Sequence, residues 1–476
     1  MKPEGRMART AFLVVVSLLA AACGAAAQAR KPNVVILMGD DLGYCDTGLY
    51  GCRDIPTPNI DSIARAGALF TSGYVTAPVC SPSRAGILTG RYQQRFGFEF
   101  NAGPLDRSIA EQLGLPPGET TLAQALKAAG YATGMVGKWH LGMQERFHPN
   151  QRGFDEYFGF LFGANLYIDP NAPGVMMIRD AEGGRLTSPR PPQNPIYRNR
   201  TPVEETEYLT DAFAREAVAF IDRHAAEPFF LYAPFNAPHA PLEATKKYLD
   251  RFPGVDEPRR KVYSAMVSAL DDAVGAILDR LKTRGLERDT LLVFLSDNGC
   301  ATYTRACTND PLRLGKLTHL EGGFRVPFTM KWPGRIPAGS RYDEAVSSLD
   351  LFPTALAAAG AAAPKGVKLD GVDLLPYVTG KKKTAPHEYL FWRNGPNDAV
   401  RSGRWKLYRP DGHVFLFDLG ADLGEQKNAA AANPEIVKRL AGALDRWEAE
   451  LHAPLWSCRS GDYAFEVDGV KLKICF

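Results

Sequence analysis

The sequence has almost no excess of charge of either sign. Its 476 residues include 56 lysines and arginines and 53 aspartates and glutamates, which gives a formal net charge of +3. Surfaces that bind nucleic acid or anionic lipid usually carry a strong positive excess. The charge balance therefore gives no argument for either kind of partner, and we predict no nucleic-acid partner.

The sequence also lacks internal repeats, coiled-coil heptads and low-complexity blocks. An apolar segment near the N-terminus, residues 11–22, is shorter than the roughly 20 residues of a membrane-spanning helix, so we predict no transmembrane span. With 45% hydrophobic and 23% charged residues, the composition is that of a folded globular protein. The length suits a large α/β enzyme with an appended smaller sheet.

The N-terminal residues have the features of an export signal. Lys2, Arg6 and Arg9 precede the apolar segment, and small residues follow it. This order predicts a signal peptide over residues 1–29 and an exported protein, periplasmic or secreted. An imperfect lipobox that ends at Cys23 leaves a lipid anchor at that cysteine as the alternative.

The spacing of a zinc site is missing as well, because no two of the eight cysteines form C-x-x-C and no histidines accompany them. Apart from Cys23 and Cys80, the cysteines form three couples that are close in sequence: Cys45 with Cys52, Cys300 with Cys307, and Cys458 with Cys475. In an oxidising compartment disulfides are the simplest account of such couples, and zinc is the alternative.

Short apolar runs alternate with helical patterns over most of the chain. The predicted buried strands are residues 33–38, 229–233 and 291–295. The predicted helices are residues 59–66, 120–129, 209–223 and 260–283. This alternation predicts an α/β fold with a mainly parallel sheet sandwiched between helices, over residues 30–363.

The last quarter of the chain has a different pattern. Three short strands and a helix are predicted there, at residues 388–392, 405–408, 414–419 and 434–451. They predict a smaller C-terminal subdomain with an antiparallel sheet over residues 364–455, followed by a C-terminal tail over residues 456–476.

Oxygen-bearing side chains follow two of the predicted strands. Asp40 and Asp41 come directly after the first strand, and Asp297 and Asn298 follow the strand at residues 291–295. Open α/β sheets bind ligands at the carboxyl ends of their strands. Neighbouring carboxylates repel each other unless a cation lies between them, and calcium prefers oxygen ligands of this kind. The two motifs together predict a calcium site.

Residues 80–91, CSPSRAGILTGR, carry the strongest chemical signal. Pro82 favours the first turn of a helix, which would place Cys80 at a helix N-terminus, where backbone amides and the helix dipole favour an anion. Arg84 adds a planar donor fork about one turn later. A buried structural cysteine before an ordinary helix is the alternative for the bare C-x-P-x-R pattern.

This segment resembles the maturation motif of type I sulfatases, the arylsulfatase-like members of the alkaline phosphatase superfamily. Three further strings match the family: GYATGMVGKWHLG from Gly130, APHAP from Ala237 and GKLTHLEGGFRVP from Gly315. The resemblance covers residues 32–428. It implies that a formylglycine-generating enzyme oxidises Cys80 to formylglycine, whose aldehyde hydrate is the nucleophile.

The resemblance also implies a role for each matching residue. Lys138 and His140 would bind the sulfate and assist the nucleophile, and His239 would protonate the leaving group. Lys316 would be a further sulfate ligand. The calcium ligands would be Asp40, Asp41, Asp297, Asn298 and the modified side chain at position 80. With calcium, Arg84 and the two lysines set against three carboxylates, the site would carry a charge of about +2, which favours an anionic substrate.

The function implied is an exported sulfatase that acts on a sulfated glycan. A phosphate or phosphonate ester hydrolase of the same superfamily is one alternative, and a glycan-binding protein that keeps Cys80 unmodified is another. Specificity is expected in the loops around residues 98–107, 165–200 and 300–313.

Several residues in and around those loops carry weaker predictions. A Pro-rich stretch, residues 170–202, is expected to be an ordered insertion near the site or a surface loop. Candidates for sugar stacking or core packing are Tyr167, Tyr197 and Trp392. Histidines without a family role, expected to be structural or surface residues, are His148, His224 and His319.

Overall fold

A computed structural model describes residues 30–103, 112–178, 194–460 and 465–476 of the chain. The predicted signal peptide and its alternative anchor Cys23 lie outside the described residues, as do parts of the Pro-rich stretch and of two predicted specificity loops. Within the described residues, no helix is both long enough and apolar enough to cross a membrane.

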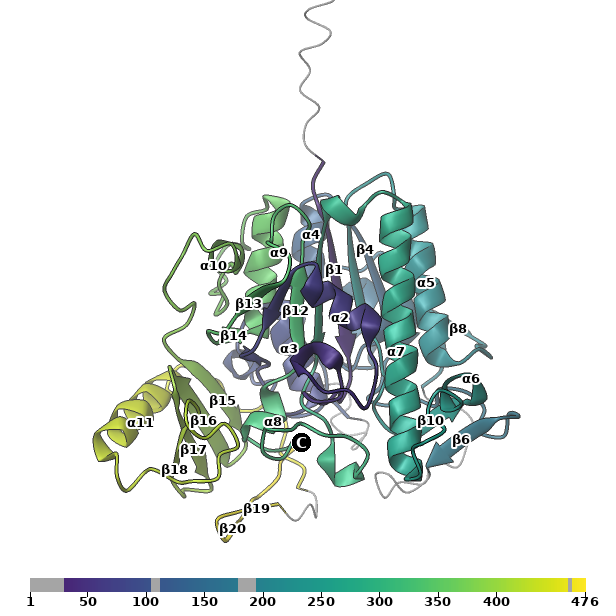
Figure 1. Cartoon of the computed structure of the whole chain (residues 1–476). Helices are drawn as coiled ribbons and strands as arrows, with labels where there is room; N and C mark the ends of the chain where they lie inside the picture. The colour runs from purple at the N-terminus through teal and green to yellow at the C-terminus, as the bar shows by residue number, and fades with distance from the viewer. Residues whose placement is uncertain (1–29, 104–111, 179–193, 461–464) are drawn as a thin grey trace, which may run out of the picture.

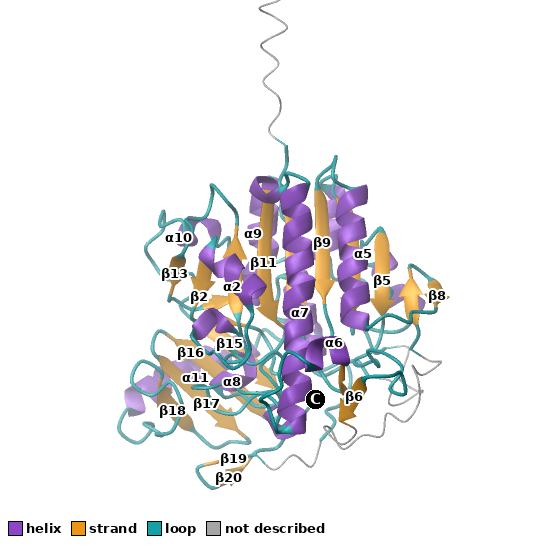
Figure 2. Cartoon of the chain, turned by 45° about the vertical axis from the view of Figure 1, so that its right-hand side comes forward, coloured by secondary structure: helices purple, strands orange, loops and turns teal. Residues whose placement is uncertain are grey.

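A ten-stranded sheet forms the centre of the molecule (Figures 1 and 2). In spatial order its strands are β13 (Ser340–Tyr342), β2 (Ala68–Phe70), β12 (Phe328–Lys331), β11 (Thr290–Ser296), β1 (Asn33–Gly39), β9 (Phe229–Pro234), β4 (Ala132–Lys138), β5 (Glu156–Phe160), β7 (Ile196–Arg198) and β8 (Thr201–Val203). The five strands from β11 to β5 run parallel, and antiparallel strands β12 and β7 flank them.

The central strands are apolar on both faces because helices cover both sides of the sheet. Along β1, Val34, Ile36 and Met38 pack into one hydrophobic cluster, whereas Val35 and Leu37 pack into a second cluster on the opposite face. Side chains alternate between the faces of a strand, so a strand buried on both faces reads as a continuous apolar run. This is why β1, β9 and β11 were predictable from the sequence.

The helices divide between the two faces. The cluster on the face of Val35 includes side chains of α2 (Pro58–Arg65), α5 (Leu209–Arg223) and α7 (Pro258–Thr283). The other cluster includes side chains of α3 (Cys80–Thr89), α4 (Leu122–Ala128) and α9 (Leu351–Ala359). In Figure 2, α5 and α7 stand upright in front of the sheet. The expected sheet sandwiched between helices is therefore confirmed.

A four-stranded antiparallel sheet packs against the lower left of the main sheet in Figure 1. Its strands are β15 (Leu390–Asn394), β16 (Asn397–Ser402), β17 (Trp405–Pro410) and β18 (Phe415–Asp418). Helix α11 (Pro434–Glu448) covers it through Leu440, Leu444 and Trp447, which share a hydrophobic cluster with Val400 and Leu407. The predicted smaller antiparallel sheet is confirmed, while the exact domain boundaries stay predictions.

A buried charge network joins the two sheets. Lys406 of β17 is fully buried, and its Nζ lies 3.2 Å from Glu321 Oε1 and 2.8 Å from Glu425 Oε1. Glu321 opens the short helix α8 (Glu321–Phe324) of the main domain, and its Oε2 also accepts from the Tyr74 hydroxyl at 2.6 Å. Buried charges of this kind are tolerated only when they are paired, so the small sheet supplies a cationic partner, in addition to Arg325, for a carboxylate of the main domain.

The remaining elements are short. The short strand pairs are β6 (Val175–Ile178) with β10 (Leu242–Thr245), β3 (Gly73–Tyr74) with β14 (Val346–Ser347), and β19 (Glu466–Val467) with β20 (Val470–Lys471). The short helices are α6 (Lys246–Leu249) and α10 (Leu375–Val378). Single 3-10 turns occur at Gly48–Tyr50, Gln93–Phe96, Glu145–Phe147, Pro149–Gln151, Glu287–Asp289, Thr302–Thr304 and Ser348–Asp350.

The three expected disulfides are confirmed: Cys45–Cys52, Cys300–Cys307 and Cys458–Cys475. The first closes a short loop after the Asp40–Asp41 pair, and the second closes a short loop after Asn298. Among the described residues, Cys80 is the one cysteine that is not in a disulfide. The cysteine with the chemical signal is therefore the one left available for chemistry.

Candidate active site

The predicted site residues meet at the carboxyl ends of four parallel strands, at the lower edge of the main sheet in Figure 1. β1 pairs with β11 in a register that aligns Gly39 with Ser296, so Asp40 and Asp297, the next residues, leave the sheet side by side. Lys138 ends β4, and the turn that carries His239 follows β9. The strand topology thus brings together groups from distant parts of the sequence.

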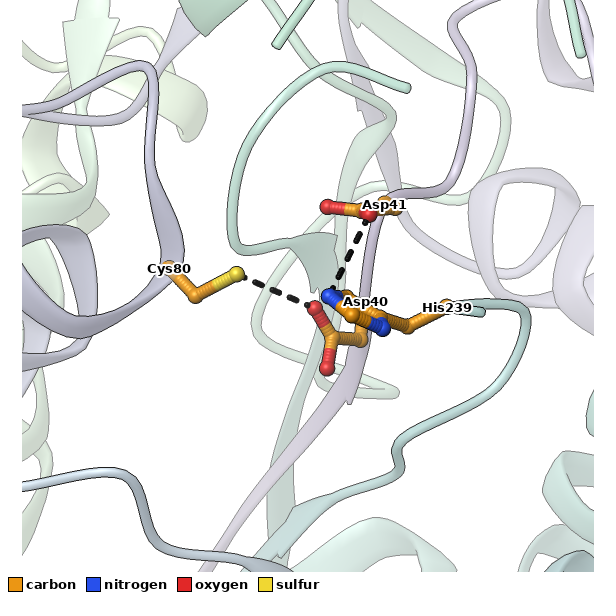
Figure 3. A group of neighbouring side chains, drawn as sticks. All are labelled: Asp40, Asp41, Cys80 and His239. Carbon is orange, nitrogen blue, oxygen red and sulfur yellow. Dashed lines mark hydrogen bonds and ion pairs between the residues drawn. The ribbon is translucent and has the colours of Figure 1, made fainter. Parts of the chain in front are cut away.

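Helix α3 begins at Cys80, as expected, and all ten of its residues are buried. The Cys80 thiol faces Asp40, with Sγ 3.4 Å from Oδ1 (Figure 3). The amide of Ser81 donates to Asn101 Oδ1 at 3.0 Å, and its hydroxyl donates to the His140 carbonyl. The first turn of the helix is therefore fixed against the loops on either side of it.

Arg84 and Lys138 hold two of the carboxylates from inside the protein. Arg84 Nε lies 2.9 Å from Asp297 Oδ2, and Arg84 Nη2 lies 3.4 Å from Asp40 Oδ2. Arg84 Nη1 donates to the Lys138 carbonyl at 2.7 Å, and Lys138 Nζ lies 2.5 Å from Asp40 Oδ2. All four side chains are fully buried. Such charge-assisted contacts fix the direction in which the carboxylates point.

Asp41 has its own set of partners. Lys316 Nζ lies 2.8 Å from Oδ2, and Asn298 Nδ2 donates to Oδ1 at 2.6 Å. His239 Nε2 lies 3.6 Å from Oδ2 (Figure 3). The same nitrogen lies 3.1 Å from Lys316 Nζ. The backbone of Asp41 has a φ of +60°. Residues other than glycine adopt this conformation only with strain, and such strained residues are more frequent at functional sites.

Burial and neighbouring charges shift the pKa values of the site in opposite directions. Burial raises the pKa of Asp297 to about 6, and the nearby Asp40 carboxylate adds to this effect. Burial would raise the pKa of Asp41 too, but Lys316 and His239 outweigh it and lower the pKa to about 2. Burial raises the pKa of the Cys80 thiol well above its usual value, although Lys138 and Lys316 act against it. An unmodified Cys80 is therefore held as a poorly nucleophilic thiol.

His140 follows β4 with a φ of +58° and is 5% exposed. Burial, together with the nearby Lys138, moves the pKa of its imidazole well below the usual value, so the ring is neutral. Its Nδ1 is buried without a hydrogen-bond partner among the described residues. Gly163 lies against the ring so closely that a Cβ there would come within 2.8 Å of it. This glycine therefore leaves space for His140 at the site.

The donor set fits a hard divalent cation. Four possible ligand atoms lie within 4.8 Å of one another: one carboxylate oxygen each of Asp40 and Asp41, Cys80 Sγ and a ring nitrogen of His239. Asp297 joins this group through its contact with the Asp41 amide at 3.3 Å, and Asn298 Oδ1 is buried without a partner among the described residues. Three carboxylates and an unsatisfied amide oxygen are ligands that calcium accepts. The four predicted oxygen ligands are thus brought to one place.

A pocket of about 250 Å³ opens onto this group. Cys80, His140, His239 and Lys316 line its floor, whereas Arg84 and Lys138 lie outside the lining. The walls are formed by Asn101, Gly103, Phe162, Gly163, Ala164, Tyr303, Leu317, Arg459 and Phe476. The predicted catalytic residues therefore divide into four that reach the pocket and two that hold the carboxylates behind it.

Several wall residues were not anticipated. Asn101 and Tyr303 come from two of the loops expected to set specificity. Arg459 and Phe476 come from the C-terminal tail, in which no site residue was predicted.

The aromatic and histidine candidates can now be placed. Tyr167 and Trp392 are core residues: the Tyr167 hydroxyl donates to the Asn236 carbonyl at 2.5 Å, and the Trp392 ring stacks on Phe324. Tyr197 is half-buried and packs against His148. His319 is buried and stacked on an aromatic ring, and His224 pairs with surface glutamates. Their expected structural or surface roles agree with these positions.

Comparison with known proteins gives consistent matches. A family model described as Sulfatase matches residues 32–361, and one described as N-sulphoglucosamine sulphohydrolase, C-terminal, matches residues 315–450. The chain is 38% identical over 414 residues to N-acetylgalactosamine-6-sulfatase of Canis lupus familiaris, covering 84% of this chain and 76% of that protein. It is 35% identical over 468 residues to human arylsulfatase A, covering 89% of each. The solved structure of Ps i-CgsB in complex with k-i-k-neocarrahexaose has a TM-score of 0.81 and 36% identity, covering 90% of this chain and 95% of that one.

Proposed function

Because this chain belongs to the sulfatase family and is therefore a sulfuric ester hydrolase, we propose that it desulfates a glycan through an oxidised Cys80 and a bound calcium ion. The observation that carries the proposal is the position of Cys80. It starts a buried helix at the floor of a pocket, beside Asp40 and outside any disulfide. An ordinary buried thiol there has a raised pKa and would be a poor nucleophile.

Two groups would supply the chemistry that the chain itself lacks. A formylglycine at position 80 would supply a hydrated aldehyde, whose hydroxyl is a nucleophile and whose second hydroxyl allows release of the product. Calcium, held by Asp40, Asp41, Asp297, Asn298 and the modified side chain, would supply positive charge for the anionic substrate and a means of lowering the pKa of a bound hydroxyl.

Charged and neutral polar side chains of the protein bind and orient the substrate anion. Lys316 and His140 line the pocket and can contact the sulfate oxygens, while Lys138, directly behind them, adds positive charge. Arg84 is fully buried between Asp40 and Asp297 and fixes both carboxylates, so it acts on the calcium site more directly than on the substrate. This placement supports binding of a tetrahedral oxyanion at the floor of the pocket.

His239 is placed to move a proton at Nε2. Its Nδ1 lies 2.5 Å from the Ala240 carbonyl, and because a carbonyl can only accept, Nδ1 carries a proton. Nε2 faces Lys316 Nζ and the pocket, so a second proton taken up there can be given to the leaving oxygen. Asp41, at 3.6 Å, stabilises the charged ring that results.

We expect His239→Ala to slow the hydrolysis of a sugar sulfate by about 10²- to 10⁴-fold, the usual effect of a general acid. The loss on 4-nitrophenyl sulfate should be much smaller, since a nitrophenolate leaves without a proton. Steady-state kcat/KM for both substrates measures the difference. His224→Ala, which removes a surface histidine, is the matched control and should change neither value. An equal loss on both substrates would exclude the general-acid role.

The glycan substrate and the export are inferred from separate observations. A curated relative is named N-acetylgalactosamine-6-sulfatase, and the structural relative Ps i-CgsB was solved in complex with k-i-k-neocarrahexaose, which supports a sulfated glycan as the substrate class. Three disulfides support an oxidising compartment, and therefore an exported protein with the signal peptide proposed over residues 1–29.

Hydrolysis of paired esters tests the proposed function against its alternatives. Protein produced together with a formylglycine-generating enzyme should hydrolyse 4-nitrophenyl sulfate with a higher kcat/KM than 4-nitrophenyl phosphate or phenyl phosphonate esters. A higher value for the phosphate or phosphonate would show the alternative esterase. Binding of a sulfated glycan without turnover, with an intact thiol at Cys80, would show a binding protein instead.

A further inference from the structure

The pocket is small for the class of substrate proposed. Its volume of about 250 Å³ lies just below the roughly 300–1,000 Å³ of pockets that enclose drug-sized ligands, which suits one sulfated sugar residue. The sugar residue next to it in the glycan would then lie at the pocket wall. On that wall the C-terminal tail contributes Arg459 and Phe476.

Arg459 is held in place although it is exposed. The Cys458–Cys475 disulfide joins the residue before Arg459 to the residue before Phe476. The Phe476 amide donates to the Arg459 carbonyl at 3.1 Å, and the guanidinium lies over the Phe476 ring, 5.7 Å from its centroid. Trp456 anchors the same segment through an edge contact with Phe98 of the main domain. The guanidinium is therefore presented by a cross-linked segment and not by a free tail.

The side chains that line this pocket carry no negative charge. Among the described residues of the lining there is no aspartate or glutamate, whereas Arg459 and Lys316 are present. Within the described part of the chain, Arg459 has no ion-pair partner, unlike Lys473 of the same segment, which pairs with Asp411 at 2.6 Å. An arginine that pairs with no carboxylate of its own protein is available to an anionic group of a ligand.

We propose that Arg459 is a specificity residue that binds a second anionic group, a carboxylate or a sulfate, on the sugar next to the one that loses its sulfate. The enzyme would then prefer polyanionic glycans to glycans with a single sulfate. This inference rests on the proposed function, because it assumes that the scissile sulfate lies at the floor of the same pocket. The tail would thereby supply substrate selection to a site built by the main domain.

Competition against 4-nitrophenyl sulfate hydrolysis tests this directly. We compare the inhibition constants of two disaccharides that share a 6-sulfated amino sugar, which is joined to glucuronic acid in one and to glucose in the other. A third disaccharide, with a sulfate on the glucose, shows whether the second anionic group has to be a carboxylate or a sulfate. In the wild type we expect at least one of the two disaccharides with a second anionic group to bind about tenfold tighter than the disaccharide with unsulfated glucose. In Arg459→Ala this ratio should fall to about one, and in the wild type it should shrink at high salt.

Lys473→Ala is the matched control, because it removes one positive charge from the same segment outside the pocket lining, and it should keep the ratio. A wild-type ratio near one, or a ratio that Arg459→Ala leaves unchanged, would overturn the inference. Failure of the proposed function would look different, since converted wild-type enzyme would then not hydrolyse 4-nitrophenyl sulfate at all.

Discussion

Cys80→Ala lowers kcat/KM for 4-nitrophenyl sulfate by at least about 10⁴-fold, because removal of a nucleophile typically costs an enzyme this much or more. The change removes one sulfur from a side chain that is 1% exposed and makes a single weak contact with Asp40, so the fold should remain. Circular dichroism and thermal unfolding measure the fold, and nitrophenolate release measures the activity.

Ser83→Ala provides the matched control on the same helix. Its hydroxyl is buried without a hydrogen-bond partner among the described residues, so its loss should leave the activity close to that of the wild type. Mass spectrometry of the peptide that contains residue 80, taken from active enzyme, should show an aldehyde in place of the thiol. Full activity with an intact thiol, or with alanine at position 80, would contradict an oxidised side chain as the nucleophile.

Asp41→Asn should nearly abolish calcium binding and, with it, turnover. The change keeps the shape of the side chain, and asparagine tolerates the positive φ at this position. It removes a negative charge that Asn298 and Lys316 orient. Loss of a ligand should cost more than the roughly 10- to 100-fold in affinity that loss of a supporting hydrogen bond costs. Calcium titration by calorimetry, with kcat/KM at each concentration, measures both effects.

Thermal unfolding gives a readout that does not depend on activity. Calcium should raise the Tm of the chelator-treated wild type, because a ligand that binds the folded state stabilises it, and it should not raise the Tm of Asp41→Asn. Asp250→Asn, which changes a surface carboxylate paired with Lys246, should respond as the wild type does. If the chelated wild type keeps full activity and its Tm is indifferent to calcium, the cation site is wrongly assigned.

Three central strands of the main sheet could be predicted because they are buried on both faces. β1, β9 and β11 are continuous apolar runs, and the prediction for α5, residues 209–223, agrees with the structure at both ends. The other strands of the main sheet were missed; β2 and β7, for example, are only three residues long. β16 was also missed, because its sequence, NDAVRS, has little of the alternation that marks a strand.

The floor of the site was predictable for a different reason. Asp40 and Asp297 each follow a recognisable strand, and parallel strands deliver their carboxyl ends to one edge of a sheet. The roles of Arg84 and Lys138 as supports of the carboxylates required coordinates, because a sequence motif does not tell whether a cation faces the pocket or lies behind it. Arg459 had no local signal, since only the tertiary fold and a disulfide bring it to the pocket.

The burial of α3 has a consequence for the order of events during biosynthesis. The residues that would mark this segment for the proposed oxidation include Pro82 and Arg84, and in the folded protein Arg84 is inaccessible to solvent. A maturation enzyme that has to contact these side chains and the Cys80 sulfur would find Arg84 fully buried and Cys80 only 1% exposed, at the bottom of a pocket. Oxidation as proposed is therefore expected to precede folding, while the segment is still an extended peptide.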